Sequence, residues 1–480
     1  MLTEPLATAG AFFDELRQRE FARLDADRVA YLDYAGAALY AESHVNAHRS
    51  LLLRGVFGNP HSEHAASRTS TSAIDAARRH VLRALDAGDD YVVCFTANAS
   101  AAIKLVAESF PFDRKVSCVL TADNHNSING IREFARRAGA DVEYLPLRDD
   151  LRLDHPEARL SQITTPGLFA FPAQSNFSGI LHPLSLVATA RSLGYRVLLD
   201  AAAFVPVHAL SLRACPADFV ALSFYKMFGY PSGVGALVAR RDALESLRRP
   251  WFSGGTIDYA SVQLQRHQSR ASHAGFEDGT ANFLDIAALE YGFAFRDRVG
   301  VARTAAHVMD LTIELLEGLV ALRRHDGSPL VCIYGPANDD RRGGVVVFNV
   351  LDRSGRAVPY GLVEDRASAA GVCLRGGCFC NPGAAEAAFR FDARRVGRCF
   401  DSLGRDFSIP RLQRCLGPHV PAGAIRASMG LANNRHDIRR ALDVVTSFMT
   451  PALPPLRRNE LPVAIARASH ANGARRRSGA

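Results

Sequence analysis

The 480-residue sequence has few cysteines and no long run of hydrophobic residues. Nine cysteines in a chain of this length are too sparse for the disulfide framework that holds small secreted proteins together. No stretch approaches the roughly 20 consecutive apolar residues that a membrane-spanning helix needs. Acidic Glu4, Asp14 and Glu15 stand near the N-terminus, where a secretory signal would carry positive charge before an apolar run. We therefore expect a soluble, cytoplasmic protein without a membrane segment.

The composition is that of an ordinary globular protein, with 48% hydrophobic and 22% charged residues. At this length we expect more than one domain. The formal net charge is +8, and arginines are concentrated at the C-terminus. Because no aromatic platform or groove-reading motif accompanies them, we expect a solvated tail rather than a nucleic-acid-binding element. The expected parts are a helical segment (1–28), a large domain (29–290), a connecting helix (291–325), a small domain (326–456) and a disordered tail (457–480).

Short β-rich runs alternate with helical runs through the first 290 residues. The runs at 91–95, 116–120, 168–171, 196–199 and 219–222 are almost continuously apolar. Such strands, separated by helices, predict a mostly parallel sheet that is covered on both faces. One long helical run is expected from about Phe283 to Leu322, and alternating segments after residue 344 predict a smaller α/β domain. In sheets of this kind, ligands bind beyond the carboxyl ends of the strands.

Residues that suit one cofactor follow the expected strands. Ala99 and Ser100 open a helix whose free amides suit a phosphate, although Ser100 is also an ordinary capping residue. His125 and Asp200 follow two further strands, and Lys226 follows a third among aromatic neighbours that lower a lysine's pKa. Each residue alone has an ordinary structural explanation. Together they predict a pyridoxal phosphate site, in which the lysine binds the aldehyde and the aspartate keeps the ring nitrogen protonated.

Seven motifs between residues 29 and 447 point to one family. They are YLDYAGA (31–37), GNPHS (58–62), FTA (95–97), PAQSNFSG (172–179), SFYKMFGYP (223–231), FEDGT (276–280) and LRGGCFCNPG (374–383). With these motifs the sequence resembles the class V branch of fold-type I pyridoxal phosphate enzymes, and within it the cysteine desulfurases. It most resembles the desulfurase domain of molybdenum cofactor sulfurases. The resemblance implies a pyridoxal phosphate-dependent transferase fold with a large and a small α/β domain.

The resemblance also implies which residues bind the cofactor. They are Lys226, Asp200, His125, Ala99, Ser100, Asn176, Ser223 and Thr280. His125 would stack on the ring and Ser223 would help to hold the phosphate. Thr280, beside Gly279, would reach the phosphate site of a neighbouring subunit, which implies a homodimer.

Substrate contacts implied by the same resemblance fall on Arg426, Asn176 and Ala35. Arg426 would bind the carboxylate of L-cysteine as a two-pronged fork. Lys226, His125 and Cys380 would be the catalytic residues. The implied reaction releases alanine from L-cysteine and leaves a persulfide on Cys380, whose sulfur then passes to an acceptor.

The pair Cys378 and Cys380 has three interpretations. A zinc site would need further ligands, and no second pair or nearby histidine completes a set of four, so we expect no metal. Two half-buried thiols would be the ordinary explanation. Beside a pyridoxal phosphate site, a cysteine on a glycine-rich loop is a candidate nucleophile. Cys380 matches the desulfurase position, and Cys378 is left open as a relay or a resolving thiol.

The sequence departs from the family pattern in three places. Ala203 stands where many desulfurases have glutamine, and Tyr225 stands where histidine is frequent. Full-length molybdenum cofactor sulfurases continue into a second domain, whereas this sequence ends in the Arg-rich tail. The acceptor is therefore left open between a separate partner, protein or small molecule, and another pathway. The alternative functions are another class V reaction (lyase, epimerase or transaminase) on a different amino acid and a sulfur-carrying protein without turnover.

Overall fold

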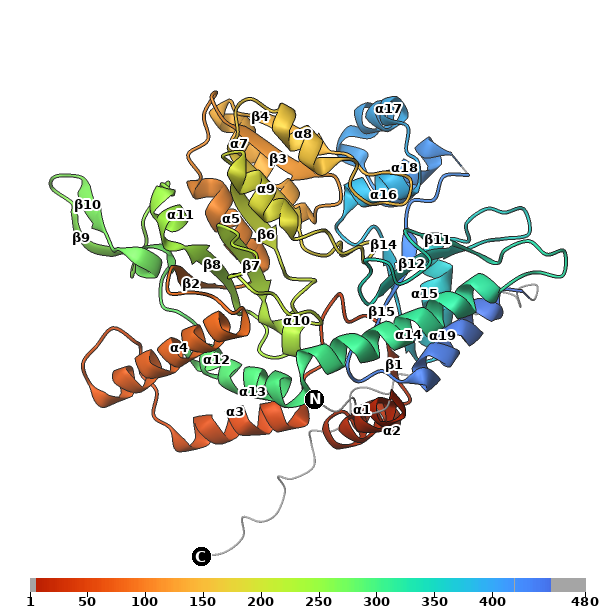
Figure 1. Cartoon of the computed structure of the whole chain (residues 1–480), viewed down its shortest axis with the longest axis horizontal. Coiled ribbons are helices and arrows are strands. Elements are labelled where there is room, and N and C mark those ends of the chain that lie inside the picture. Colours follow the sequence, from red (N-terminus) through yellow and green to blue (C-terminus); the bar gives the residue numbers. More distant parts are fainter. Residues whose placement is uncertain (1–5, 418, 450–480) are drawn as a thin grey trace, which may run out of the picture.

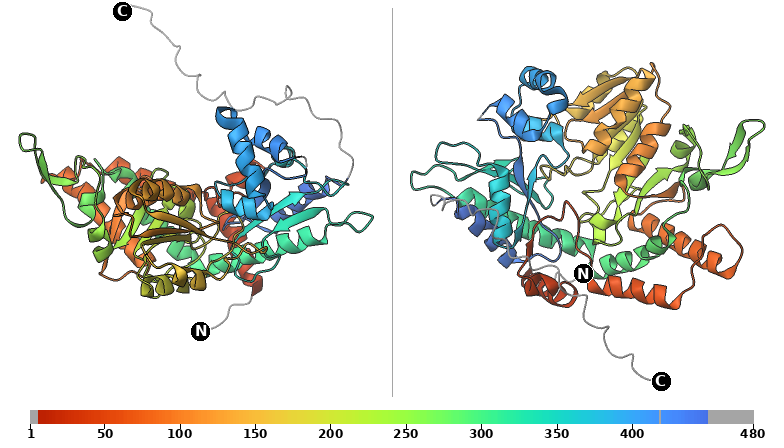
Figure 2. Two further views of the ribbon diagram at one scale, coloured as in Figure 1. Left: turned by 90° about the horizontal axis from the view of Figure 1, so that it is seen from above. Right: turned by 180° about the vertical axis from the view of Figure 1, so that it is seen from behind.

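The computed structural model describes residues 6–417 and 419–449. The expected tail, 457–480, lies outside these ranges, as do the first residues of the expected segment 1–28. Two helices open the described chain, α1 (Leu6–Glu20) and α2 (Arg23–Ala26). A large and a small layered region then lie side by side (Figures 1 and 2).

The large region is built on a seven-stranded sheet with the order β2-β8-β7-β6-β5-β3-β4. Five of its strands follow the apolar runs of the sequence closely. The strands are β2 (Tyr91–Thr96), β3 (Ser117–Thr121), β4 (Asp141–Leu145), β5 (Leu168–Pro172), β6 (Arg196–Asp200), β7 (Phe219–Ser223) and β8 (Gly235–Arg240). All neighbouring strands run parallel except at β8, which is antiparallel to both β2 and β7. The expected α/β class with a mostly parallel sheet is therefore confirmed.

Helices cover both faces of this sheet, as its doubly buried strands require. One hydrophobic cluster joins the sheet to helices on one face, and a second cluster does so on the other. On the first face lie α4 (Ala65–Ala84), α8 (Pro156–Gln162), α9 (Ser185–Ser192), α12 (Phe283–Ala287) and α13 (Leu289–Val299). On the second lie α5 (Ala99–Ser109), α6 (Asn126–Asn129), α7 (Ile131–Ala138) and α11 (Arg241–Ser246). Because the strands β3 to β7 run parallel, their carboxyl ends lie at the same edge of the sheet.

The small region has a four-stranded antiparallel sheet in the order β11-β12-β15-β14. Its strands are β11 (Val331–Tyr334), β12 (Val345–Val350), β14 (Arg375–Gly377) and β15 (Ala424–Ser428). Apolar side chains from α14 (Val301–Ala321), α15 (Tyr360–Ala369) and α19 (Arg435–Thr446) pack with this sheet in one cluster. The N-terminal strand β1 (Ala30–Tyr31) also joins this region, because it pairs with β13 (Val372–Cys373). The single helical run expected from 283 to 322 is three helices, α12 to α14, and Gly300 with φ of 85° separates the last two.

Four remaining parts lie around these two sheets. Helix α3 (Glu42–Arg54) precedes α4, and the short α10 (Phe224–Phe228) follows β7. A hairpin of β9 (Ile257–Ser261) and β10 (Arg266–Ser269) projects from the large region, followed by a 3-10 turn, Ser272–Phe276 (Figure 1). Helices α16 (Pro382–Ala388), α17 (Ala393–Leu403) and α18 (Ile409–Leu416) form a group, with a 3-10 turn at Gly404–Asp406. A disulfide between Cys399 and Cys415 joins α17 to α18, a pairing that the sequence did not indicate.

None of the helices within residues 6–417 and 419–449 combines the length and the apolar character that crossing a lipid bilayer requires.

Candidate active site

A cavity of about 140 Å³ opens at the edge where the parallel strands of the large sheet end. Seven residues predicted from the sequence line this cavity together. They are Ala99, Ser100, His125, Asn176, Asp200, Ser223 and Lys226. The structure therefore brings together, from five different strand ends, residues that are up to 127 positions apart in the sequence. Their individual roles remain predictions.

The N-terminus of α5 forms one end of the cavity. Asn98 caps the helix, and its side-chain oxygen accepts a hydrogen bond from the Ala101 amide at 3.0 Å. The Ala99 amide donates to Ser223 Oγ at 2.9 Å, and the Ser100 hydroxyl lies 2.5 Å from that of Ser127. The helix dipole and these donors favour an anion at this end.

Lys226 and Asp200 occupy the next part of the cavity. Asp200 is the last residue of β6 and only 8% exposed, with one carboxylate oxygen accepting from the Ala202 amide at 3.0 Å. Lys226 lies on α10, directly after β7. Burial lowers the pKa of Lys226, and the nearby Asp200 carboxylate partly opposes this effect. A lysine with a lowered pKa holds more of its neutral, nucleophilic form at neutral pH.

His125 is held in a defined tautomer by the backbone. Its Nδ1 accepts a hydrogen bond from the Ser127 amide at 3.1 Å, as the cap of α6, so that Nε2 carries the proton of the neutral ring. Burial lowers the pKa of His125, and the positive charges of Lys226 and Arg426 act in the same direction, although Asp200 raises it. The net effect favours the uncharged imidazole.

Arg426 lies in β15 of the small region and is 2% exposed. It does not line the cavity itself, but its positive charge lowers the pKa of both Lys226 and His125, which do. It donates to the Asn176 carbonyl at 3.0 Å and to the Asp33 carboxylate at 3.1 Å. The Asp33 carboxylate also accepts from Arg375 at 3.0 and 2.5 Å. Burial lowers the pKa of Arg426, and Asp33 raises it. Two arginines thus share one aspartate, which leaves a net positive site that suits a carboxylate.

The segment 377–381 brings Cys380 to this site. Phe379 and Cys380 both have φ of 55°, a left-handed conformation that costs non-glycine residues about 1–2 kcal/mol each. The Cys380 carbonyl accepts from the Asn126 amide at 2.7 Å, directly beside His125. Cys380 is exposed, and it lies close enough to Lys226 and Arg426 that a negative charge on its sulfur would raise the pKa of both.

Two asparagines hold this segment in place. Asn176 donates through Nδ2 to the Phe379 carbonyl at 2.7 Å, and its Oδ1 accepts from Asn381 Nδ2 at 2.9 Å. Asn381 also donates to the Asp123 carbonyl at 2.6 Å and caps α16 by accepting from the Ala384 amide. It is fully buried. The predicted contact of Asn176 with the ring therefore has a competitor, since its amide is already engaged by the segment.

Cys378 differs from Cys380 in its surroundings. Its thiol donates to the Ala422 carbonyl at 3.3 Å. Burial raises the pKa of Cys378 to about 11. Five residues further on, Gly383 approaches the backbone so closely that a Cβ there would lie 2.0 Å from the Ala122 carbonyl oxygen. The two thiols thus differ in their surroundings, since Cys378 is half-buried and hydrogen-bonded and Cys380 is exposed.

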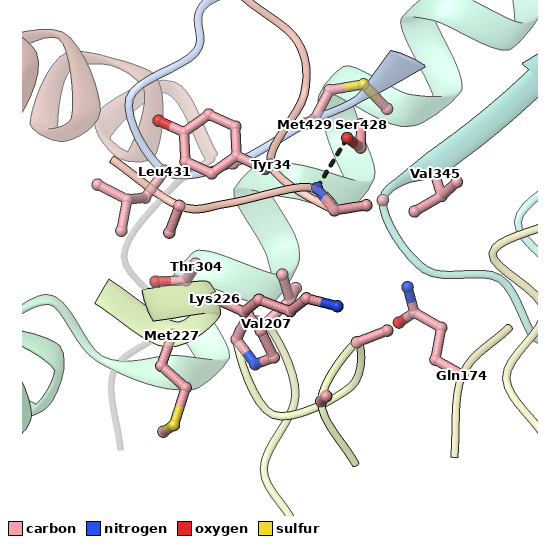
Figure 3. A pocket seen from close by; sticks show the side chains of 17 residues that line it. Tyr34, Gln174, Val207, Lys226, Met227, Thr304, Val345, Ser428, Met429 and Leu431 are labelled. Atoms are coloured by element: carbon pink, nitrogen blue, oxygen red, sulfur yellow. Dashed lines mark hydrogen bonds between the residues drawn. The ribbon is translucent and has the colours of Figure 1, made fainter. Parts of the chain in front are cut away.

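Two predicted residues lie elsewhere. Thr280 and Gly279 line a separate hollow of about 520 Å³ that also contains Asn59, His61 and Arg270. Ala35 lines a second, small cavity of about 40 Å³ that Lys226 also lines, and its amide donates to Ser428 Oγ at 2.9 Å (Figure 3). Thr280 thus does not contribute to the cavity of its own chain.

Several site residues were missed by the sequence reasoning. Arg375, Asp33 and Asn381 stood inside the quoted motifs without an assigned role. Asn381 had a local signal, since asparagine followed by proline is typical of a helix start. The partnership of Asp33 with two arginines more than 340 positions away had none.

The donor set fits pyridoxal phosphate. One cavity is surrounded by a buried lysine, a carboxylate with one free oxygen, an imidazole and an anion-binding helix start. These groups suit a ligand that carries an aldehyde, a ring nitrogen and a phosphate. In the described ranges, no three histidine, cysteine or acidic side chains gather as a metal site would need.

Comparison with known proteins gives consistent results. The chain is 34% identical to a molybdenum cofactor sulfurase from Arabidopsis thaliana over 91% of its length, and 35% identical to one from Homo sapiens over 89%. It spans 58% and 50% of those two relatives.

Solved structures share the fold. The apo cysteine desulfurase of Thermococcus onnurineus superimposes with a TM-score of 0.76 at 23% identity, covering 94% of this chain and 99% of that one. The cysteine desulfurase CsdA of Escherichia coli gives a TM-score of 0.72 at 19% identity, covering 91% and 98%. The model of the family described as aminotransferase class-V matches residues 30–441. The chain therefore belongs to the aminotransferase class-V family.

Proposed function

We propose that the chain is a pyridoxal phosphate-dependent cysteine desulfurase, which converts L-cysteine to alanine and carries the released sulfur on Cys380. The observation that carries the proposal is the hydrogen bond from the Asn126 amide to the Cys380 carbonyl. This hydrogen bond places the backbone of Cys380 next to His125, which lines the same cavity as Lys226. The names of the relatives, molybdenum cofactor sulfurase and cysteine desulfurase, support the same chemistry.

Cofactor binding is assigned to the residues around the cavity. Lys226 would bind the aldehyde, Asp200 would pair with the ring nitrogen and His125 would cover the ring. The start of α5, with Ala99, Ser100 and the Ser223 hydroxyl, would hold the phosphate. The cofactor, when bound, supplies an electron sink next to the substrate's Cα.

The protein's own groups then carry out the proton and sulfur steps. Arg426, with Asp33 fixing its orientation, binds the substrate carboxylate. Once the substrate's amino group has replaced Lys226 at the aldehyde, the freed neutral amine of Lys226 would take the Cα proton. The Cys380 thiolate would then bond to the substrate sulfur while the substrate's C–S bond breaks, and the electron pair of that bond would stay on the substrate's Cβ, which takes a proton. One thiol and one L-cysteine thereby give one persulfide and one alanine, with no external oxidant.

The remaining expectations concern the assembly and the acceptor. We infer a homodimer in which Thr280 serves the phosphate site of the second subunit, because it lies outside the cavity of its own chain. Size measurement by light scattering tests this inference. The sulfur acceptor, protein or small molecule, reaches Cys380 from solvent, where that residue is exposed. Cytoplasmic location stays a prediction, which cell fractionation tests.

The decisive experiment is incubation with L-cysteine, followed by alanine measurement and mass spectrometry of the peptide that contains both cysteines. We expect alanine and a sulfur adduct on Cys380. Cys378→Ser is the matched control, because the half-buried and hydrogen-bonded Cys378 should be dispensable. Cys380→Ser should abolish the adduct. A protein that binds the cofactor but yields neither product would point to another class V reaction.

A further inference from the structure

Gln174 is a buried polar residue to which neither the sequence nor the proposed function gives a role. It lies just beyond the end of β5 and is 4% exposed. Its amide oxygen has no hydrogen-bond partner among the described residues. A buried amide oxygen without a hydrogen-bond partner costs about 1–3 kcal/mol of stability. A ligand that hydrogen-bonds to this amide, through its oxygen or, once the amide has turned, through its nitrogen, recovers that free energy. Gln174 therefore marks a place where a polar ligand atom belongs.

The position of Gln174 relates it to Lys226. Both side chains line the cavity of about 140 Å³ and also the smaller cavity of about 40 Å³. Figure 3 shows the Gln174 amide and the Lys226 ammonium pointing toward one another. The amide rests against Gly343, where a Cβ would lie 2.4 Å from its oxygen. Glycine at 343 thus leaves the space that lets the amide adopt this orientation.

The neighbouring amide, Asn176, is not free in the same way. Its nitrogen donates to Phe379 and its oxygen accepts from Asn381, so both ends serve the Cys380 segment. Gln174 is the uncommitted amide of the two. An amide can turn by 180° about its last bond and so present either nitrogen or oxygen.

The covalent structure of pyridoxal phosphate supplies the missing partner. Its aldehyde carbon is flanked on one side by the phosphate arm and on the other by a phenolic oxygen. With the aldehyde at Lys226 and the phosphate at the start of α5, the phenolic oxygen would lie on the side of the aldehyde that is away from the phosphate, and Gln174 is the uncommitted amide beside Lys226. We propose that Gln174, and not Asn176, donates a hydrogen bond to the phenolic oxygen of pyridoxal phosphate. The inference rests on the proposed function.

This contact affects the pKa of the yellow complex, by which we mean the protein whose Lys226 nitrogen is bonded to the aldehyde carbon of pyridoxal phosphate. The Lys226 nitrogen, once bonded to the aldehyde carbon, shares a proton with the phenolic oxygen. An amide that donates to that oxygen favours the form in which the proton has left, because the oxygen then carries uncompensated negative charge. The yellow form is the protonated one, and it is lost as the pH rises. Gln174 thus lowers the pH at which this loss occurs.

The test is a pH titration of the visible absorbance of the protein loaded with pyridoxal phosphate. Gln174→Leu should move the midpoint upward by about one pH unit, the shift that one neutral hydrogen bond produces. Gln174→Glu, nearly the same size, should move it further upward, because its carboxylate repels the phenolic oxygen. Gln162→Leu, an exposed glutamine at the end of α8, should leave the midpoint unchanged.

Midpoints of Gln174→Leu and Gln174→Glu that equal the wild-type value would overturn the assignment. If Gln174→Leu does not fold, the near-isosteric Gln174→Glu decides alone. A wild-type protein that shows no yellow complex would instead refute the proposed function, so the two failures are distinct.

Discussion

The edge of the large sheet and the segment 377–381 position their functional groups by different means. At the sheet edge, Asp200 ends a strand and Lys226 follows one, so hydrogen-bonded strands fix both backbones. In the segment, two consecutive non-glycine residues hold a left-handed conformation, and hydrogen bonds to the large region hold them there. The first group is placed by the fold and the second by a few contacts.

This difference suggests a division of work. The groups that bind the cofactor need one geometry throughout the reaction, which strand ends provide. The sulfur carrier must meet the substrate and then an acceptor, so its backbone is secured by contacts that are local and few. Damage at the sheet edge should therefore abolish the chemistry, whereas damage to the contacts that hold the backbone of the segment should reduce it.

The largest effect is expected at the sheet edge. Lys226→Ala removes both the aldehyde-binding amine and the proposed base, and alanine release should fall by about 10³-fold or more. Amino-acid analysis after incubation with L-cysteine measures it. Lys104→Ala on the outer face of α5 is the control and should retain activity, since that side chain is 64% exposed. Comparable losses in both variants would contradict the assignment.

A smaller effect is expected in the segment. Asn381→Ala removes the donor to Asp123 and Asn176 and the cap of α16. Alanine release should fall by about 10²-fold, the effect of a misplaced reacting group, while the yellow complex remains. Steady-state rates and absorbance together give the two readouts, with the exposed Asn338→Ala as the control. Loss of the yellow colour in Asn381→Ala would contradict the view that the segment positions Cys380 without taking part in cofactor binding.

Between the two regions, Arg426 should affect substrate binding. Arg426→Lys keeps the charge but loses the fork, and the KM for L-cysteine should rise about ten-fold, as one lost charge-assisted hydrogen bond implies. Arg375→Lys should have less effect, because that side chain is 49% exposed. Equal changes in the two KM values would show that burial does not decide which arginine binds.

The smallest effect concerns pH. Only the neutral amine of Lys226 captures the aldehyde, and burial lowers its pKa below the ordinary 10.5. The rate of cofactor capture should therefore rise with pH and level off below 10.5. In Asp200→Asn the carboxylate that raises this pKa is gone, so the curve should move to lower pH. Stopped-flow absorbance measures both curves, and a shift of the variant to higher pH would contradict this account.

Much of the large region was predictable because its signals are local. Apolar runs gave the strands, and the residues after them, such as His125 and Asp200, had to meet at one edge because parallel strands end together. The position of Lys226 at this edge was predictable for the same reason, because it directly follows another of these strands. The helical run after 283 was predicted as one element, since the break at Gly300 leaves the apolar pattern uninterrupted.

The contacts between the two regions were not predictable from local pattern. Asp33 meets Arg375 and Arg426 across more than 340 positions, and only tertiary packing decides that pairing. The occupation of Asn176 by the Cys380 segment is of the same kind. So is the bond between Cys399 and Cys415, whose helices are set face to face by their own small cluster.

Gly383 has a consequence for the natural variation of this chain. With the Ala122 carbonyl where a Cβ would be, no larger residue fits unless the helix start that follows Cys380 moves away. A library of all amino acids at 383 should therefore return glycine alone among active clones, whereas the exposed position 386, one turn later, should accept most replacements. The position of Cys380 relative to the start of α16 thus depends on residue 383 having no side chain.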